Sequence, residues 1–221
     1  MAKPELVIFD CDGVLIDSEV LSLQAAIEIL AQEHGIVLTM QEAITRFVGR
    51  SHASGIADIK EKNGIDVSER YLTRSKQRRE ELFEQDLKPI ASIETLLDSL
   101  PMPKCVASGS SPERLRHSLE LVGLWDRFAP HVYSATQVKN GKPAPDLFLF
   151  AAEQMGVAPS ACLVVEDSVA GVRAGVAAGM KVFGFTGGSH CDDKQIERLA
   201  REGADAIFDH MDRMTEAFRD L

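Results

Sequence analysis

Two aspartates separated by a single residue end a short apolar run near the start of the chain, in the stretch LVIFDCDGVLID. Carboxylates at this spacing, Asp10 and Asp12, can hold a divalent cation or act in acid–base and nucleophilic chemistry. An EF-hand calcium loop would also need Asp or Asn at the fifth position counted from Asp10 and glycine at the sixth, where this chain has Val14 and Leu15. The pair therefore indicates a carboxylate site of another kind.

Other polar residues follow apolar runs elsewhere in the chain. Ser108 and Gly109 come after one such run, Glu166 and Asp167 after another, and Lys142 lies between them in the stretch NGKPAPD. In an open parallel sheet, ligands bind at the carboxyl ends of the strands. We therefore expect these residues to meet the aspartate pair at one edge of one sheet.

Carboxylates gathered with a lysine and a serine–glycine turn fit phosphoryl transfer. A phosphate dianion can approach carboxylates only where a cation neutralises them, and Mg²⁺ prefers oxygen ligands. Asp10 and Asp167, with Glu166 as a further candidate, would supply those ligands. One carboxylate of the D-x-D pair can attack phosphorus to form an aspartyl-phosphate, while the second donates a proton to the leaving oxygen and later takes one from water.

The remaining groups suit the transferred phosphoryl group itself. Lys142 can balance its charge, and Ser108 with the backbone N–H groups of residues 109–110 can hold its oxygens. Each residue also has a plainer interpretation: Ser108 as a turn residue, Glu166 and Asp167 as strand end and helix cap, and Lys142 as a surface lysine. Their expected convergence at one sheet edge favours the chemical interpretation, because the separate structural roles do not predict it.

The elements that would position these residues are short apolar runs separated by helical patterns. Runs buried on both faces and connected by helices are typical of a parallel sheet. We expect strands at residues 6–9, 105–107, 163–165 and 182–185, with a weaker one at 206–208. Helices are expected at residues 93–99, 112–122, 146–155, 169–178, 192–202 and 211–219. The predicted fold class is α/β, with a doubly wound parallel sheet.

The interval from residue 16 to residue 87 has a different pattern, with no β-branched run and one helix after another. Helices are expected at residues 21–34, 41–48, 53–63 and 68–85, with turns at His34-Gly35 and Asn63-Gly64. A helical insertion after the first strand is the simplest explanation. We therefore predict a catalytic core of residues 1–15 and 88–221 and a small α-helical cap domain of residues 16–87.

Charge and composition exclude several classes of protein. The 221 residues carry a formal net charge of -10 with a pI near 5.1, which argues against a nucleic-acid partner. The basic run at residues 74–79 is followed by glutamates, so we expect a solvated helix face there. No apolar stretch is long enough to cross a membrane and the first residues lack a signal-peptide pattern. We therefore expect a cytoplasmic protein and, by default, a monomer.

The four cysteines indicate neither a metal site nor cysteine chemistry. They form no C-x-x-C pair and no His/Cys cluster with zinc spacing. None is followed by arginine at the spacing that a cysteine phosphatase would need. We interpret them as reduced thiols.

The motifs together resemble those of the haloacid dehalogenase superfamily of phosphohydrolases. FDCDGVLIDSE resembles the first family motif, VASGSS the second, GKPAPD the third and VVEDSVAGVRAGVAAGM the fourth, in the same order along essentially the whole chain. The resemblance implies a Rossmann-like core, a helical cap inserted after the first motif, and Mg²⁺ as the cofactor. It also implies these roles: Asp10 as nucleophile, Asp12 as general acid/base and as metal ligand through its carbonyl, Ser108 and Lys142 as phosphate ligands, and Glu166 and Asp167 at the metal.

The place of the cap and the size of the chain resemble the branch that contains phosphoglycolate phosphatase and β-phosphoglucomutase. Mutases of that branch commonly have a histidine in the segment where DSEVLSLQ has Ser22 and no histidine. The loop FVGRSHASG carries Arg50 and His52 in shifted places. Hydrolysis is therefore favoured over mutase activity. Dehalogenases usually lack the second aspartate, so Asp12 indicates a phosphate ester.

The predicted function is that of a Mg²⁺-dependent phosphatase acting on a small phosphorylated metabolite, a sugar phosphate or a related acid. A β-phosphoglucomutase-like phosphomutase is the alternative. A non-enzymatic signalling module that only accepts a phosphoryl group ranks lower, because receiver domains are shorter and have no cap. Arg50 and His52 are candidates for substrate contact, and ordinary surface positions are the alternative for both.

Overall fold

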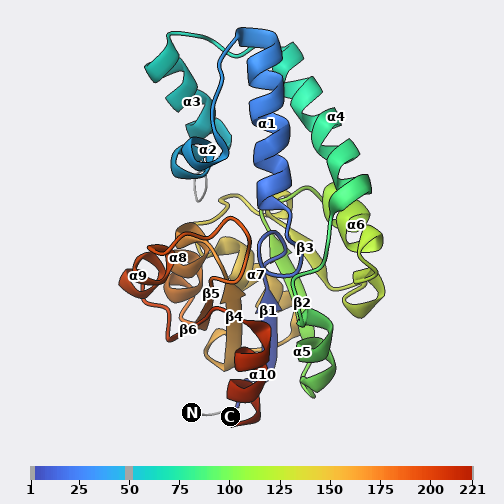
Figure 1. The fold of residues 1–221 in the computed structure, drawn as a ribbon. Helices are drawn as coiled ribbons and strands as arrows, with labels where there is room; N and C mark the ends of the chain where they lie inside the picture. The colour runs from blue at the N-terminus through green and yellow to red at the C-terminus, as the bar shows by residue number, and fades with distance from the viewer. Residues whose placement is uncertain (1–2, 48–51, 221) are drawn as a thin grey trace. The chain divides into compact units, whose positions relative to one another are not determined.

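A computed structural model describes residues 3–47 and 52–220 of the chain (Figure 1). The chain divides into two compact units, Met1–Ile16 with Pro89–Leu221, and Asp17–Lys88. We call the first the sheet unit and the second the helical unit. The sequence predicts these borders one position earlier, at 15/16 and 87/88. The roles of the two units as catalytic core and cap stay predictions.

The sheet unit is built on a parallel sheet. Its described residues form six strands: β1 (Leu6–Phe9), β2 (Lys104–Ser108), β3 (Val132–Ser134), β4 (Cys162–Glu166), β5 (Lys181–Phe185) and β6 (Ala206–Phe208). Neighbouring strands pair in parallel in the order β3-β2-β1-β4-β5-β6. The chain first runs from β1 to one edge and then returns to the other side of β1 with β4. The doubly wound α/β fold is confirmed, and its topological switch point lies at β1.

Helices connect these strands. They are α5 (Ile93–Ser99), α6 (Pro112–Leu121), α7 (Asp146–Met155), α8 (Val169–Ala177), α9 (Gln195–Arg201) and α10 (Met211–Arg219), with the short 3₁₀ turns η1 (Trp125–Arg127), η2 (Ala135–Gln137) and η3 (Pro159–Ala161). Local sequence explains where α6 begins. The Ser111 side chain accepts a hydrogen bond from the backbone N–H of Arg114, and Pro112 occupies the first helical position.

Two details of this unit differ from the prediction. The edge strand β3 was not expected, because three residues carry too little periodicity to be recognised. The helix expected from residue 192 begins instead at Gln195. Asp192 Oδ1 accepts a hydrogen bond from the backbone N–H of Lys194 at 3.1 Å, which holds the chain in a turn before the helix starts.

Both faces of the sheet are covered. Alternate residues of a strand point to opposite faces. On one face, α7, α8 and α9 pack on strand residues such as Ile8 and Val164. On the other, Phe183 meets Phe218 of α10, with ring centroids 5.6 Å apart. Burial on both faces explains the continuous apolar runs of the sequence and gives the strand ends a rigid support.

The helical unit contains α1 (Glu19–His34), α2 (Met40–Phe47), α3 (His52–Asn63) and α4 (Glu69–Asp86). Its buried core includes Leu30 of α1 and Tyr71 of α4. Arg78 Nε lies 2.7 Å from Glu28 Oε2 of α1, and Arg74 pairs with Glu33 on the same helix. The basic run, expected to be a solvated face, instead joins α4 to α1 through two of its arginines.

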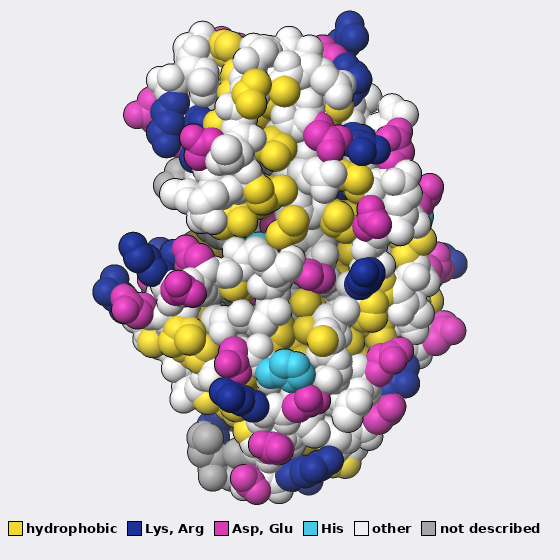
Figure 2. Space-filling model, in the orientation of Figure 1, with side chains coloured by type: hydrophobic (Ala, Val, Ile, Leu, Met, Phe, Trp, Pro, Cys, Tyr) yellow, Lys and Arg dark blue, Asp and Glu magenta, His cyan; other side chains and the backbone are white. Residues whose placement is uncertain are grey.

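The described surface agrees with the composition. On the face drawn in Figure 2, Lys and Arg side chains are interspersed with Asp and Glu and form no continuous basic patch. Among residues 3–47 and 52–220, no helix combines the length and the apolar character that a bilayer crossing requires. All four cysteines are free thiols.

Candidate active site

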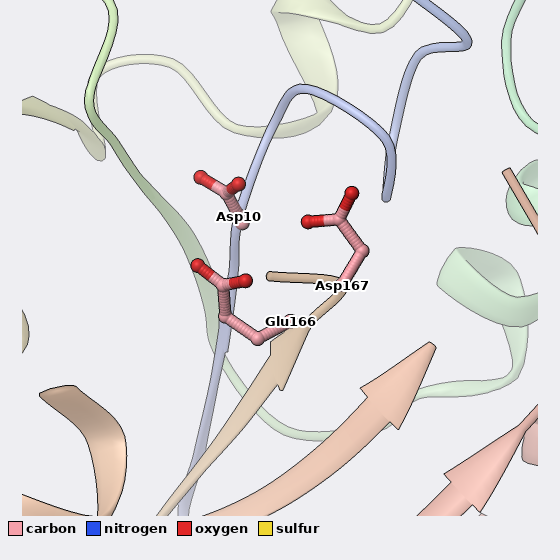
Figure 3. A group of neighbouring side chains, drawn as sticks. All are labelled: Asp10, Glu166 and Asp167. Atoms are coloured by element: carbon pink, nitrogen blue, oxygen red, sulfur yellow. The ribbon is translucent and has the colours of Figure 1, made fainter. Parts of the chain in front are cut away.

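Three buried carboxylates lie together at the carboxyl ends of β1 and β4 (Figure 3). Asp10 follows β1 directly, Glu166 is the last residue of β4, and Asp167 comes next. One oxygen atom from each residue lies within 4.8 Å of the others. The pairing of β1 with β4 continues past β1, because the Asp10 N–H donates to the Val165 carbonyl at 3.0 Å. The sheet ladder therefore brings together carboxylates that are more than 150 positions apart in the sequence.

Lys142 reaches this group from the loop that precedes α7. Its Nζ lies 2.9 Å from Asp10 Oδ1 and 2.6 Å from Glu166 Oε1. The lysine side chain is only 10% exposed, and Nζ also lies 4.8 Å from the centroid of the Phe148 ring. The surface interpretation of Lys142 is therefore wrong, and the lysine bridges the two strand-end carboxylates.

Burial and charge shift the pKa values of this group. Burial raises the pKa of Asp10 well above its ordinary value, and Glu166 and Asp167 add to the effect while Lys142 opposes it. Burial alone would lower the pKa of Lys142, but Asp10 and Glu166 outweigh it and raise that pKa. The lysine therefore stays charged, while the carboxylates repel one another.

Glu166 has both of its oxygens engaged within the protein. Oε1 accepts from Lys142, and Oε2 accepts from the backbone N–H and the hydroxyl of Ser168 at 2.8 and 2.9 Å. A Cβ placed on Gly171 would lie 1.7 Å from Glu166 Oε1, so a residue without a side chain is needed in the first turn of α8. Glu166 thus anchors Lys142. The residue that caps α8 is Ser168, whose hydroxyl accepts a hydrogen bond from the backbone N–H of Gly171.

The carboxylate of Asp12 lies outside the acidic group and has partners of its own. Its Oδ2 accepts from the Ser110 hydroxyl at 2.7 Å, and its Oδ1 pairs with Arg114 at 2.7 Å. The two aspartates of the D-x-D pair therefore occupy different surroundings. A role of Asp12 as metal ligand through its backbone carbonyl stays a prediction.

Ser108 and Gly109 lie at the end of β2, next to β1. Ser108 is almost fully buried, and its Oγ accepts a hydrogen bond from the backbone N–H of Ser110 at 3.1 Å. That N–H, expected to hold a phosphoryl oxygen, is thus directed at Ser108. A Cβ on Gly109 would meet no atom within 4 Å, so the backbone there borders open space.

Three residues at the site were not singled out from the sequence: Arg114, His190 and Gln195. His190 Nε2 lies 3.0 Å from Asp167 Oδ2, and the Gln195 amide donates to the Asp167 carbonyl. Burial would lower the pKa of His190, but hydrogen bonds with Asp167 and Cys191 outweigh it and raise the value to about 11. The stretch TGGSH directly follows β5. Since ligands bind at the carboxyl ends of parallel strands, the residues after this strand are candidates for the site, and His190 is one of them.

The residues present fit a divalent cation. Of the three buried carboxylates, Asp10 and Glu166 pair with Lys142, and Asp167 pairs with His190. Burial raises the pKa of Asp167 as well as that of Asp10. Within the described part of the chain, no hydrogen bond reaches Asp10 Oδ2 or Asp167 Oδ1. Carboxylates that lie this close together suit a hard cation such as Mg²⁺, which would also relieve their repulsion.

The two candidates for substrate contact cannot be placed in the same way. Arg50 lies outside the described residues. His52 begins α3, and its side chain is not described.

Comparison with known proteins connects this site to a family. The family model for haloacid dehalogenase-like hydrolases matches residues 4–179. A 6-phosphogluconate phosphatase from Escherichia coli (strain K12) is 33% identical over 193 residues, which cover 86% of this chain and 86% of that protein. A solved haloacid dehalogenase-like protein from Agrobacterium tumefaciens has a TM-score of 0.89 at 38% identity and covers 98% of each chain. A family hydrolase from Deinococcus radiodurans, solved with bound phosphate and sodium, has a TM-score of 0.84 at 30% identity and covers 100% of this chain and 97% of that one.

The matched part of the chain includes most of the residues that form the candidate site. The span matched by the family model contains the three clustered carboxylates, Lys142 and Asp12. A non-enzymatic signalling module is not compatible with this membership. The chain therefore belongs to the haloacid dehalogenase-like hydrolase family and is an enzyme of its phosphatase type.

Proposed function

We propose that this enzyme is a Mg²⁺-dependent phosphatase that hydrolyses a small phosphorylated sugar or sugar acid through an aspartyl-phosphate intermediate. The observation that carries the proposal is the placement of Asp10. Its carboxylate lies at the switch point of the sheet, 2.9 Å from the Lys142 ammonium and beside Asp167. Ligands of such sheets bind at this point.

Asp10 is the proposed nucleophile. In the first step its carboxylate oxygen forms a bond to phosphorus while the bond from phosphorus to the ester oxygen breaks. Lys142 donates hydrogen bonds to Asp10 and Glu166. Its ammonium group would balance the charge on the transferred group. A bound Mg²⁺ would lower the repulsion between the carboxylates and the phosphate and polarise the phosphoryl oxygens.

Asp12 is the proposed proton carrier. It donates a proton to the leaving ester oxygen in the first step. In the second step it takes a proton from the water that attacks phosphorus, which releases phosphate and restores the Asp10 carboxylate. Ser110 and Arg114 hold the two oxygens of Asp12, so they position the proton carrier away from the acidic group.

The substrate class is supported by the relatives. The Escherichia coli protein is named for 6-phosphogluconate, a phosphorylated sugar acid, and the Deinococcus radiodurans protein was solved with bound phosphate. Both matches extend over most of this chain, so the two proteins share more than the sheet with it. Arg50 and His52, the candidates predicted from the sequence, remain our proposal for contact with the substrate.

A panel of sugar phosphates and phosphorylated sugar acids, assayed for phosphate release with Mg²⁺ and with EDTA, tests this function. We expect release that depends on Mg²⁺ and that is lost in Asp10→Asn, which keeps the size of the side chain but removes the nucleophilic charge. Release that survives chelation, or that persists in Asp10→Asn, would contradict the proposal.

The same preparations decide between hydrolysis and the phosphomutase alternative. A phosphatase releases inorganic phosphate and leaves a free sugar. Conversion of a hexose 1-phosphate into its 6-phosphate, started by a hexose bisphosphate and without phosphate release, would instead identify a mutase.

A further inference from the structure

We propose that His190 is a positioning residue that holds the Asp167 carboxylate in the orientation needed to bind Mg²⁺. The inference rests on the metal site of the proposed function. It assigns a role to the loop after β5, which carries none of the four sequence motifs. Its basis is the hydrogen bonding and the packing around Asp167.

A single hydrogen bond fixes the rotation of this carboxylate. His190 Nε2 lies 3.0 Å from Asp167 Oδ2, and both side chains are almost fully buried, at 3% and 4% exposure. Oδ2 is therefore committed to the histidine. Because the two oxygens of a carboxylate are rigidly linked, a fixed Oδ2 also fixes the direction of Oδ1, and no hydrogen bond from the described residues reaches Oδ1.

Gly13 and Gly188 have no side chains, and this makes room for the His190 ring and the Asp167 carboxylate. Gly13 has a φ of +78°, and a Cβ there would lie 1.9 Å from Asp167 Oδ2 and 2.8 Å from His190 Cε1. A Cβ on Gly188 would also lie 2.8 Å from His190 Cε1. The glycine of the first motif is thus required by the pair of His190 and Asp167, as well as by the turn of its own backbone.

The main chain of Asp167 is held separately. Gln195 is 4% exposed, and its amide nitrogen donates to the Asp167 carbonyl. Its amide oxygen accepts from Arg198 Nε at 2.9 Å, which fixes the orientation of the amide. Since Gln195 holds the backbone, the contribution of His190 is specific to the direction of the side chain.

The unused nitrogen of His190 argues against a purely structural role. Nδ1 is buried and has no hydrogen-bond partner among the described residues. A buried polar atom without a partner destabilises the fold, and an apolar side chain of similar size would avoid that cost. The imidazole is therefore useful here for the bond that Nε2 makes to Asp167.

Metal binding by the full chain tests the inference without reference to turnover. We would titrate the protein with Mn²⁺, a stand-in for Mg²⁺ that can be followed by electron paramagnetic resonance, and repeat the titration for His190→Leu and His190→Gln. Leucine removes the donor, whereas the glutamine amide can occupy the position of Nε2. Outer hydrogen bonds to metal ligands typically contribute about 10–100-fold in affinity, so we expect that loss in His190→Leu and a loss of at most about 3-fold in His190→Gln.

Substrate kinetics complete the test. At saturating Mg²⁺ we expect the KM of the ester to change little in His190→Leu, since the histidine acts through the metal ligand. If the leucine variant does not fold, His190→Asn replaces it, because its shorter amide cannot reach Asp167. Unchanged Mn²⁺ affinity in His190→Leu, or in His190→Asn where it replaces the leucine variant, would overturn the inference. So would a loss of Mn²⁺ affinity in His190→Gln as large as the loss in that variant. Absence of Mn²⁺ binding by the unaltered protein would instead overturn the metal site of the proposed function.

Discussion

At the scale of single residues, the site depends on charges that are buried and paired. Lys142 is the cation that the structure places between Asp10 and Glu166, and it is 10% exposed. Buried ion pairs contribute little relative to an apolar core, but removal of one partner is costly because the other charge stays buried. This asymmetry gives a prediction for both stability and activity.

Replacement of Lys142 by methionine should lower the free energy of unfolding by about 3–5 kcal/mol, the typical effect of leaving a buried charge without its partner. Urea unfolding in EDTA measures this loss. Phosphate release should fall by about 10²–10³-fold, as for loss of one group that stabilises transition-state charge. Lys139→Met, at an exposed lysine three positions earlier, is the matched control and should change neither quantity. Equal effects of the two substitutions would contradict the role of Lys142.

The sequence is sufficient to find the residues that follow the central strands. Asp10, Asp167 and Lys142 stand next to runs or stiffened loops that are recognisable without a structure. Arg114 and His190 are different, because an arginine in an amphipathic helix and a histidine in a loop have many ordinary roles. Only the three-dimensional arrangement shows that they reach Asp12 and Asp167.

At the scale of elements, the first turn of α8 is fitted closely around the site. Gly171 lies where the Glu166 carboxylate leaves no room for a side chain, since a Cβ would lie 1.7 Å from Oε1. Helix propensity and this contact predict opposite effects for alanine. The sign of the measured change therefore distinguishes them.

Gly171→Ala should destabilise the protein and weaken phosphate release, because Glu166 must move and would carry Lys142 with it. Propensity alone predicts a gain of up to about 1 kcal/mol for the same change. Urea unfolding gives the sign, and the initial rate of phosphate release gives the effect on the site. A more stable variant with unchanged rate would contradict the close fit of α8.

In the helical unit, ion pairs join α4 to α1. The hydrogen bond from Arg78 is the largest cause that lowers the pKa of Glu28, with a second from Gln24. A carboxylate whose pKa is lowered on folding stabilises the protein above its unfolded pKa and loses that contribution as pH falls through the folded value. The pair is partly exposed, so its effect is modest.

Arg78→Met should therefore lower Tm at pH 7, and by only a small amount because the pair with Glu28 is partly exposed. The difference from the unaltered protein should shrink as the pH is lowered from about 5 toward 3, where Glu28 becomes protonated. Thermal unfolding by circular dichroism at several pH values measures this. Lys76→Met on the same helix is the control, since Lys76 is 69% exposed. A difference that grows in acid would contradict the sign.

The helices and central strands could be predicted because their periodicity is long enough to recognise. The edge strand β3 and the start of α9 could not, since the first has three residues and the second depends on one side chain turning the backbone. The basic run of α4 shows a third limit. Its composition suggests a solvated face, but the partners Glu28 and Glu33 lie 50 and 41 positions before Arg78 and Arg74 in the sequence.

At the scale of the whole molecule, an enzyme with a net charge of -10 is proposed to bind an anionic ester. The arrangement of the sheet makes this possible by gathering Lys142, Asp10 and Asp167 at the switch point, where a bound cation would reverse the local field. Sequence matches over most of the chain and a TM-score of 0.89 with a family structure support one origin for the fold and the site.

The central claim is that Asp10 carries the phosphoryl group during turnover, and chemical trapping tests it most directly. Asp12→Asn, which lacks the proposed proton acceptor for hydrolysis, would be mixed with 4-nitrophenyl phosphate and Mg²⁺, because the 4-nitrophenolate leaving group needs no proton donor in the first step. The mixture would then be quenched with borohydride and analysed by peptide mass spectrometry. Borohydride reduces an aspartyl-phosphate to homoserine. We predict homoserine at position 10 only when both substrate and Mg²⁺ are present. An unmodified Asp10, or a reduced residue at another position, would contradict the account.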